Sequence, residues 1–159
     1  MGLVKCRVCG RKVSEEAARK VEGAFCCPPC HDKLAERPML EFLSCPVSPL
    51  KLMGEFTGCI IEAARNHQIA MPLSMAMAGG SAPVTLAGTM VTHNAEVLGG
   101  IVLAQLAEKG AKCVYGTSTT AFDLQRAAAT VGTPELGLIS AAVAEMGRFY
   151  MLPTYGAGL

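Results

Sequence analysis

Four cysteines near the amino end form the most chemically specific pattern in this sequence. They make two C-x2-C pairs, Cys6 with Cys9 and Cys27 with Cys30, separated by 17 residues. Two residues between paired cysteines allow both sulfur atoms to reach one ion, and the spacer is typical of structural zinc sites. Because four thiolates leave no open coordination position, such an ion would stabilise the fold and take no part in catalysis.

The ligand set of this predicted zinc site stays partly open. Cys26 could replace Cys27, and His31 could replace Cys30. Two alternatives need no metal, namely buried reduced cysteines or disulfides in an exported protein. Two C-x2-C pairs in so short a span favour zinc, and we predict a small zinc-ribbon-like module over residues 1–37.

The composition changes close to Pro38. Residues 1–40 hold five of the eight cysteines, with eight Lys/Arg against five Asp/Glu, whereas residues 41–159 are long and aliphatic. The first segment is too short to bury an adequate core, so a metal would be its main stabilising element. Phe25 is its only aromatic residue and its basic residues are scattered, which gives no nucleic-acid surface. The net charge of +1 likewise gives no reason to expect a nucleic-acid or anionic-membrane partner.

The longest stretch without charged residues runs over residues 66–95 and is long enough to span a bilayer. Pro72, Pro83 and the pair Gly79-Gly80 interrupt it, and a lipid-exposed helix could not satisfy its backbone through such breaks. The amino terminus lacks the apolar segment of a signal peptide. We therefore expect a cytoplasmic protein that does not enter the membrane.

From residue 40 onward the sequence alternates strand and helix patterns, which predicts parallel strands joined by right-handed crossovers. Strands are predicted over residues 40–45, 69–77, 112–116 and 151–155, and helices over 54–67, 89–109 and from Thr133-Pro134-Glu135 onward. The predicted buried faces of these helices are Phe56, Ile60, Ala63 and Ala64; then Val91, Ala95, Leu98, Val102 and Leu106; and then Leu136, Ile139, Val143 and Met146.

Two loops, residues 78–88 and 117–132, are long and rich in Ser, Thr and Gly, and both follow strands. Ligands of parallel α/β folds bind at the carboxyl ends of the strands, so these loops should line any binding cavity. The alternative is that their hydroxyl groups only satisfy turn backbone. The candidate cavity residues are Met75, Met77, Ser81, Thr117, Ser118, Thr119, Thr120 and Asp123.

The remaining polar and small residues have simpler explanations. His93 and Glu96 share a helix face, for which a surface pair is a sufficient reason. Cys45, Cys59 and Cys113 are too far apart to suggest a site and are predicted to be core residues. The pair Gly99-Gly100 inside a helix indicates close backbone packing. The sequence contains neither a G-x-G-x-x-G motif after a strand nor a P-loop, so a nucleotide cofactor has no support.

From about residue 38 the sequence closely resembles the trimethylamine methyltransferase family of corrinoid-dependent methyl transfer, whereas no resemblance is found for residues 1–37. The matching stretches are residues 45–50, 73–83, 86–98, 101–106, 115–116, 118–124, 134–144 and 153–159. The resemblance implies a (β/α)8 TIM barrel that moves a methyl group from a methylated amine to the cobalt of a partner corrinoid protein. A complete barrel needs about 250 residues, so residues 38–159 would be a central segment of it, truncated at both ends, with about four strands and three to four helices.

The resemblance also implies that no catalytic residue lies within residues 1–159. In pyrrolysine-containing members, pyrrolysine follows the stretch that ends here at Leu159 and is encoded by an in-frame amber codon. We expect Leu159 to precede such a codon, which sequencing beyond it would test. Pyrrolysine's imine would orient or activate the amine for attack by Co(I). Members without pyrrolysine use quaternary amines such as glycine betaine.

Two other functions remain open alongside this one. The first is a non-enzymatic zinc-binding interaction protein that carries a remnant barrel scaffold, and the second is a complete small α/β enzyme with its site in the two long loops. For the methyltransferase segment, the expected partners are a corrinoid protein and a small methylated amine. We also expect the chain alone to be inactive and to self-associate, because a half barrel has open strand edges and an apolar inner face.

Overall fold

A computed structural model describes residues 2–6, 10–21, 24–29 and 40–157. The amino-terminal part contains two short antiparallel pairs, β1 (Leu3–Lys5) with β2 (Lys12–Ser14), and β3 (Arg19–Val21) with β4 (Ala24–Cys26). Gly10 has a φ of +73°, and its amide donates to the carbonyl of Cys6 at 2.9 Å. Glycine adopts this left-handed backbone conformation without the strain that a side chain would bring.

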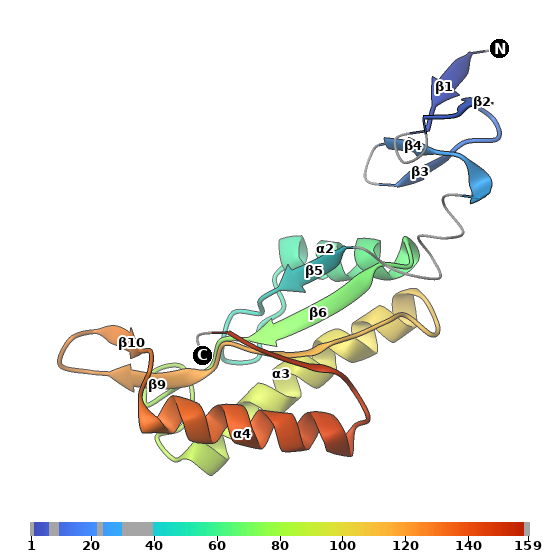
Figure 1. The fold of residues 1–159 in the computed structure, drawn as a ribbon. Coiled ribbons are helices and arrows are strands. Elements are labelled where there is room, and N and C mark those ends of the chain that lie inside the picture. The colour runs from blue at the N-terminus through green and yellow to red at the C-terminus, as the bar shows by residue number, and fades with distance from the viewer. Residues whose placement is uncertain (1, 7–9, 22–23, 30–39, 158–159) are drawn as a thin grey trace.

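The rest of the chain is an α/β unit built on a four-stranded parallel sheet, as the sequence predicts. Its strands neighbour one another in the order in which they occur in the chain, and a helix connects each pair (Figure 1). The elements are β5 (Glu41–Ser44), α2 (Gly54–Arg65), β6 (Ile69–Ser74), α3 (Leu86–Ala107), β8 (Tyr115–Thr117), α4 (Pro134–Phe149) and β11 (Thr154–Gly156).

The central strand β6 is buried on both faces, which explains its nearly continuous apolar sequence. Side chains alternate between the two faces of a strand. Ala70 and Pro72 face the helices, since Ala70 belongs to the cluster beneath α2 and α3 and Pro72 abuts Gly100 of α3. Met71 and Leu73 therefore face the opposite side, and both are buried as well.

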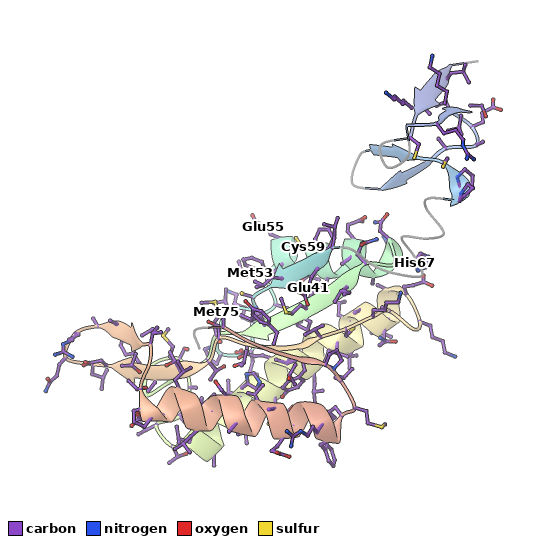
Figure 2. The ribbon with its side chains drawn as sticks, in the orientation of Figure 1. Glu41, Met53, Glu55, Cys59, His67 and Met75 are labelled. Atoms are coloured by element: carbon purple, nitrogen blue, oxygen red, sulfur yellow. The ribbon has the colours of Figure 1, made fainter. Side chains whose placement is uncertain are left out.

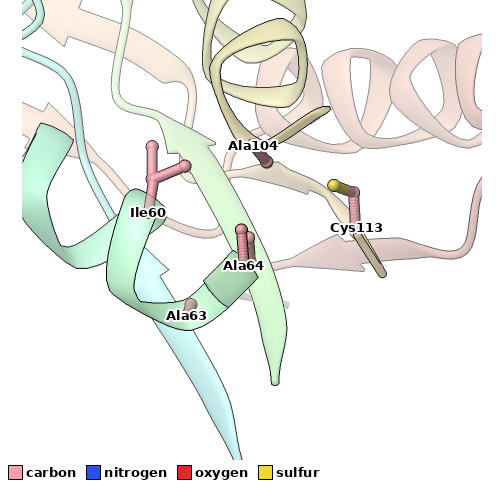
Figure 3. Close-up of a cluster of buried hydrophobic side chains, with 6 residues drawn as sticks. Ile60, Ala63, Ala64, Ala104 and Cys113 are labelled. Carbon is pink, nitrogen blue, oxygen red and sulfur yellow. The ribbon is translucent and has the colours of Figure 1, made fainter. Parts of the chain in front are cut away.

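The helices hold the sheet through two clusters of buried side chains. One joins Ile60, Ala63 and Ala64 of α2 to Ala104 of α3 and to Cys113 (Figure 3). The other joins α3, β8 and α4, and its buried members are Val97, Tyr115, Ile139 and Val143.

The predicted buried faces of α2 and α4 are confirmed except at Phe56, which lies in the first turn of α2 and is exposed. Of the predicted core cysteines, Cys113 is buried and Cys45 is half-buried. The prediction is wrong for Cys59, which is exposed on α2 because it lies beside, and not within, the face made by Ile60, Ala63 and Ala64.

The predicted buried face of α3 is wrong except at Leu98, which is half-buried against the cluster around Val97. Val91, Val102 and Leu106 are 71%, 56% and 80% exposed. The face that packs on the sheet instead carries polar and small residues: Thr89, His93, Glu96, Val97, Gly100 and Ala104. Apolar periodicity misidentifies the face because its polar members find hydrogen-bond partners on other segments of the folded chain, and the close approach to β6 requires small side chains.

The structure also differs from the sequence prediction at the carboxyl ends of the strands. The strand predicted over residues 69–77 ends at Ser74 and is followed by a separate short strand, β7 (Met77–Ala78). The segment 117–132, predicted as a loop, contains a hairpin of β9 (Thr120–Asp123) and β10 (Ala128–Thr130). Strand β9 pairs with β7, so a small second sheet stands at the carboxyl ends of β6 and β8 (Figure 1).

Two further features bear on the predictions. Within the described ranges, no helix is both long enough and apolar enough to span a membrane. In the same part of the chain, β5 and β11 are the outer strands of the parallel sheet, and neither pairs with a further strand on its outer side. The sheet formed by residues 40–157 is therefore open at both edges.

Candidate functional site

The neighbouring strands β6 and β8 end side by side, with Ser74 opposite Thr117. The connections that leave these ends carry most of the residues that the sequence suggested for a binding cavity. Figure 2 shows Met75 at the carboxyl end of β6, at the end of the strand away from His67. This carboxyl face is where the strand–helix connections of parallel α/β folds bind their ligands.

A buried carboxylate, Glu96 of α3, lies behind this face. It is 3% exposed and accepts hydrogen bonds from three donors. The hydroxyl groups of Ser74 and Ser48 donate to Oε2 at 2.6 and 2.9 Å, and the backbone amide of Leu50 donates to Oε1 at 2.9 Å. Such charge-assisted bonds compensate a buried charge, and here they fasten the segment after β5 to the end of β6.

The hydrogen bonds that begin at Glu96 continue from Ser74 to the segment after β8, so that Glu96, Ser74, Thr119 and His93 form a buried polar chain. The Thr119 hydroxyl lies 3.3 Å from Ser74 Oγ and 3.4 Å from the Ser74 carbonyl oxygen. On its other side it lies 3.0 Å from Nδ1 of His93. Ser74, Thr119 and His93 are each fully buried, so their hydrogen bonds to one another satisfy polar groups inside the protein.

His93 lies in an apolar and aromatic environment. Its ring meets that of Tyr115 edge-to-face, with 5.4 Å between centroids, and its Nε2 atom is buried without a hydrogen-bond partner in the described part of the chain. Burial lowers the pKa of His93 to about 4. The Tyr115 hydroxyl donates to Asn94 Oδ1 at 2.8 Å, and burial, followed by the nearby Tyr150, raises the pKa of Tyr115.

We expect His93 to make the protein less stable as the pH falls. Its pKa drops from 6.5 to about 4 on folding, so between these values the unfolded chain binds a proton that the folded chain does not. The free energy of unfolding therefore decreases as the pH is lowered through this window. Chemical unfolding at a series of pH values should show this loss, and it should be smaller in a His93→Gln variant. Equal slopes in the two proteins across the window would contradict the assignment.

Several predicted cavity residues direct their polar groups to the local backbone. Ser81 Oγ accepts from the Met77 amide at 3.1 Å, and Thr117 Oγ1 accepts from the Thr119 amide at 3.1 Å. The Thr120 hydroxyl donates to the Thr130 carbonyl. Asp123 Oδ1 accepts from the amides of residues 125 and 126 in the turn between β9 and β10. For these groups, satisfaction of turn backbone accounts for the residue type.

The other predicted residues are more accessible at this face. Met75 is 45% exposed, while Met77 and Ser118 are half-buried. Thr119 differs from its neighbours because its hydroxyl joins His93 to Ser74.

Sequence reasoning missed the importance of His93 and Glu96. They are not a surface pair, because both are buried and no hydrogen bond joins them directly. Their position on a helix rich in apolar residues gave a weak signal, since polar side chains on a helix that packs against a sheet need internal partners. The partners are Ser48, Ser74 and Thr119, which are 48, 22 and 26 residues away along the chain.

A groove of about 210 Å³ borders Glu96 on the side of the segment after β5. Besides Glu96 it is lined by Pro46, Leu50, Leu52, Ala95 and Gly99. Its walls are mainly apolar, and the carboxylate oxygen atoms of Glu96 are already engaged by their three donors. The groove therefore offers Glu96 little capacity to bind a further polar ligand.

The predicted metal site lies only partly within the described residues. Cys6 and Cys27 are both 1% exposed, whereas Cys9 and Cys30 lie outside the described ranges, as does the alternative ligand His31. Within those ranges, no group of three or more His, Cys, Asp or Glu side chains could hold a metal ion. The four-cysteine site therefore stays a prediction.

Comparison with known proteins identifies the family of this chain. The sequence model of the family described as trimethylamine methyltransferase (MTTB) matches residues 30–159. The chain belongs to this family. The match begins eight residues before the boundary expected from the sequence and includes all of the α/β unit.

Individual relatives agree with this assignment. The chain is 58% identical over 127 residues to trimethylamine methyltransferase MttB2 of Methanosarcina mazei and 50% identical over 127 residues to trimethylamine methyltransferase MttB of Desulfitobacterium hafniense. Each alignment covers 80% of this chain and 26% of the relative, so the chain spans about a quarter of their length.

A more distant relative aligns over more of the chain. Glycine betaine methyltransferase of Desulfitobacterium hafniense is 34% identical over 154 residues, which is 97% of this chain and 32% of the relative. This alignment extends into the cysteine-containing segment, where the sequence analysis found no resemblance.

Proposed function

We propose that this chain is a segment of a methyltransferase that moves a methyl group from trimethylamine to the cobalt of a partner corrinoid protein. The observation that carries the proposal is the family match over residues 30–159, together with relatives named trimethylamine methyltransferase at 50–58% identity. The lower identity of 34% to a glycine betaine methyltransferase makes a tertiary amine the better supported substrate.

The strand order supports placing the α/β unit in a (β/α)8 barrel. Four parallel strands neighbour one another in chain order, each followed by a helix or by the end of the unit, as successive staves of a barrel do. Adjacent helices also pack on each other through the clusters that α3 shares with α2 and with α4. The open edges at β5 and β11 are where further staves would pair, and we propose that the chain alone self-associates there.

In this proposal the carboxyl face forms part of the wall of the amine cavity. Met75 offers a soft, polarisable apolar surface that suits methyl groups, and Ser118 offers a half-exposed hydroxyl beside it in the next connection. The corrinoid would supply the nucleophile that accepts the methyl group. The described residues of this face would bind and orient the amine and exclude water. They would do no more than this, because the Asp123 carboxylate and the hydroxyl groups of Ser81 and Thr117 already accept hydrogen bonds from the backbone.

The activity should be tested on the complete gene product with its corrinoid protein. We expect trimethylamine to methylate the reduced corrinoid and glycine betaine to react much more slowly. The change in cobalamin absorbance measures both rates. The proposed function is overturned if the protein demethylates neither trimethylamine nor glycine betaine. A faster reaction with glycine betaine would overturn the substrate assignment only.

The place of Met75 in the cavity wall can be tested in the same assay. We expect Met75→Lys to raise KM for trimethylamine about tenfold or more, since an ammonium group would repel the protonated amine and hydrate an apolar wall. Met151→Lys is the matched control, because Met151 is 90% exposed and follows α4 at the other end of the sheet. An unchanged KM in the Met75 variant would remove this residue from the cavity.

We further propose that residues 1–37 bind one structural zinc ion through Cys6, Cys9, Cys27 and Cys30. Protein purified without chelators should contain about one zinc ion per chain, as a four-thiolate site requires. A Cys6→Ser variant should lose most of this zinc, measured by elemental analysis. Cys59→Ser removes an exposed cysteine outside the pattern and should retain it. Zinc-free wild-type protein, or equal zinc in both variants, would contradict the site.

A further inference from the structure

The buried polar chain that links α3 to the carboxyl face has a direction, which the donor and acceptor chemistry of its members fixes. A carboxylate can only accept, so the Ser74 hydroxyl, at 2.6 Å from Glu96 Oε2, donates its proton to Glu96. Its lone pairs then face the Ala76 amide at 3.3 Å and the Thr119 hydroxyl at 3.3 Å. The next proton in the chain must therefore come from Thr119.

Thr119 extends this direction to the imidazole. Two acceptors of Ser74, its carbonyl oxygen and its hydroxyl oxygen, lie on one side of the Thr119 hydroxyl. When Thr119 donates toward Ser74, its oxygen can accept from His93 Nδ1 at 3.0 Å, so Nδ1 carries the hydrogen. This arrangement leaves a lone pair on the buried Nε2 atom without a partner, which is less costly than leaving a buried N–H without one.

We infer that Glu96 is a positioning residue that orders the three connections at the carboxyl face through this one-way chain and thereby sets the tautomer of His93. These hydrogen bonds hold the segment after β5 through Ser48 and Leu50 and the segment after β8 through Thr119. They hold the segment after β6 through Ser74, whose Oγ also accepts from the Ala76 amide. That these connections shape an amine cavity rests on the proposed function, whereas the hydrogen-bond chain does not.

The substitution Glu96→Gln should reverse the direction of donation along these hydrogen bonds without breaking any of them. The Leu50 amide can only donate, so it selects the orientation in which glutamine Oε1 accepts from Leu50. Glutamine Nε2 then donates to the hydroxyl groups of Ser48 and Ser74. Ser74 can in turn donate to Thr119. The Thr119 hydrogen then has two acceptors within reach, His93 Nδ1 at 3.0 Å and the Ser74 carbonyl oxygen at 3.4 Å. The shorter contact favours Nδ1, which places the hydrogen of the imidazole on Nε2.

Nitrogen-15 NMR of labelled protein near neutral pH shows which ring nitrogen of His93 carries the hydrogen, because protonated and unprotonated ring nitrogens have well-separated chemical shifts. The chain has three histidines, and a His93→Gln spectrum identifies the signals of His93. We expect the hydrogen on Nδ1 in the wild type and on Nε2 in Glu96→Gln. Glu145→Gln is the matched control, because Glu145 is an exposed helical glutamate that pairs with the exposed Arg148, and it should leave the tautomer unchanged.

Two results would overturn the inference: a wild-type His93 that carries its hydrogen on Nε2, or a folded Glu96→Gln protein with the wild-type tautomer. The wild-type spectrum alone can therefore contradict the proposed direction of the hydrogen bonds, even if the variant fails to fold. The measurement needs neither amine nor corrinoid protein and works in solution or in the solid state. Its failure is thus distinguishable from failure of the proposed methyl transfer.

Discussion

Replacing Glu96 with alanine is expected to lower the free energy of unfolding by about 2–4 kcal/mol, because buried donors lose their acceptor and a void remains. The Ser74 hydroxyl is fully buried and loses the carboxylate oxygen that accepts its hydrogen. The Leu50 amide and the Ser48 hydroxyl lose their partner in the same step, which also releases the segment after β5. Denaturant unfolding gives the change in stability, and amide hydrogen exchange at Leu50 reports on the released segment.

The control for this prediction is Glu145→Ala on α4. Glu145 is exposed and pairs with the exposed Arg148 across one helical turn, so its loss should change stability by less than about 0.5 kcal/mol. Equal effects of the two substitutions would show that the buried chain contributes nothing to stability. Unchanged exchange at Leu50 in Glu96→Ala would show that the carboxylate does not hold the segment after β5.

Two adjacent glycines of α3 are expected to respond to alanine in opposite directions. At Gly100 an added Cβ would lie 2.4 Å from Cβ of Pro72 in the central strand and 3.4 Å from Ile60 Cδ1. The proline ring closes onto the backbone nitrogen of β6 and cannot turn away, so helix and sheet would have to separate. We expect Gly100→Ala to destabilise the protein by about 1–3 kcal/mol through overpacking.

Gly99 provides the matched control, because an added Cβ there meets nothing within 4 Å. Alanine is the better helix former, so Gly99→Ala should stabilise the protein by about 0.5–1 kcal/mol. Thermal or denaturant unfolding of the two variants measures both effects. Stabilisation by both substitutions would mean that α3 does not approach β6 as closely as the structure places it. The glycine pair in the sequence indicated close packing, and the structure assigns it to Gly100 alone.

The polar chain gives the carboxyl face an internal support that does not depend on its surface residues. The connections that follow the strands β5, β6 and β8 meet at Glu96 and Thr119. In a binding site, side chains hold their positions when the groups behind them are fixed by packing and hydrogen bonds. We therefore expect changes at Glu96 to affect Met75 and Ser118 together, although neither touches Glu96 in the described contacts.

Much of the architecture follows from the sequence because it depends on local patterns. Helix α4 begins at Pro134, whose fixed φ suits a first helical turn, and buries Leu136, Ile139 and Val143 at helical spacing. The apolar run of β6 identifies a strand covered on both faces, and the alternation of strands with helices identifies a parallel sheet. The family could also be identified in this way, since its motifs are continuous stretches of chain.

Other features were decided only by tertiary structure. The buried face of α3 is one, because periodicity favours Val91, Val102 and Leu106, while burial depends on whether each side chain finds a partner in the folded protein. Glu96 and His93 can be buried only because Ser74 and Thr119, distant in sequence, arrive beside them. The second sheet is another, since β7 forms a strand by pairing with β9, more than forty residues later. Local sequence reports propensity, whereas the partners that satisfy a buried polar group exist only once the chain has folded.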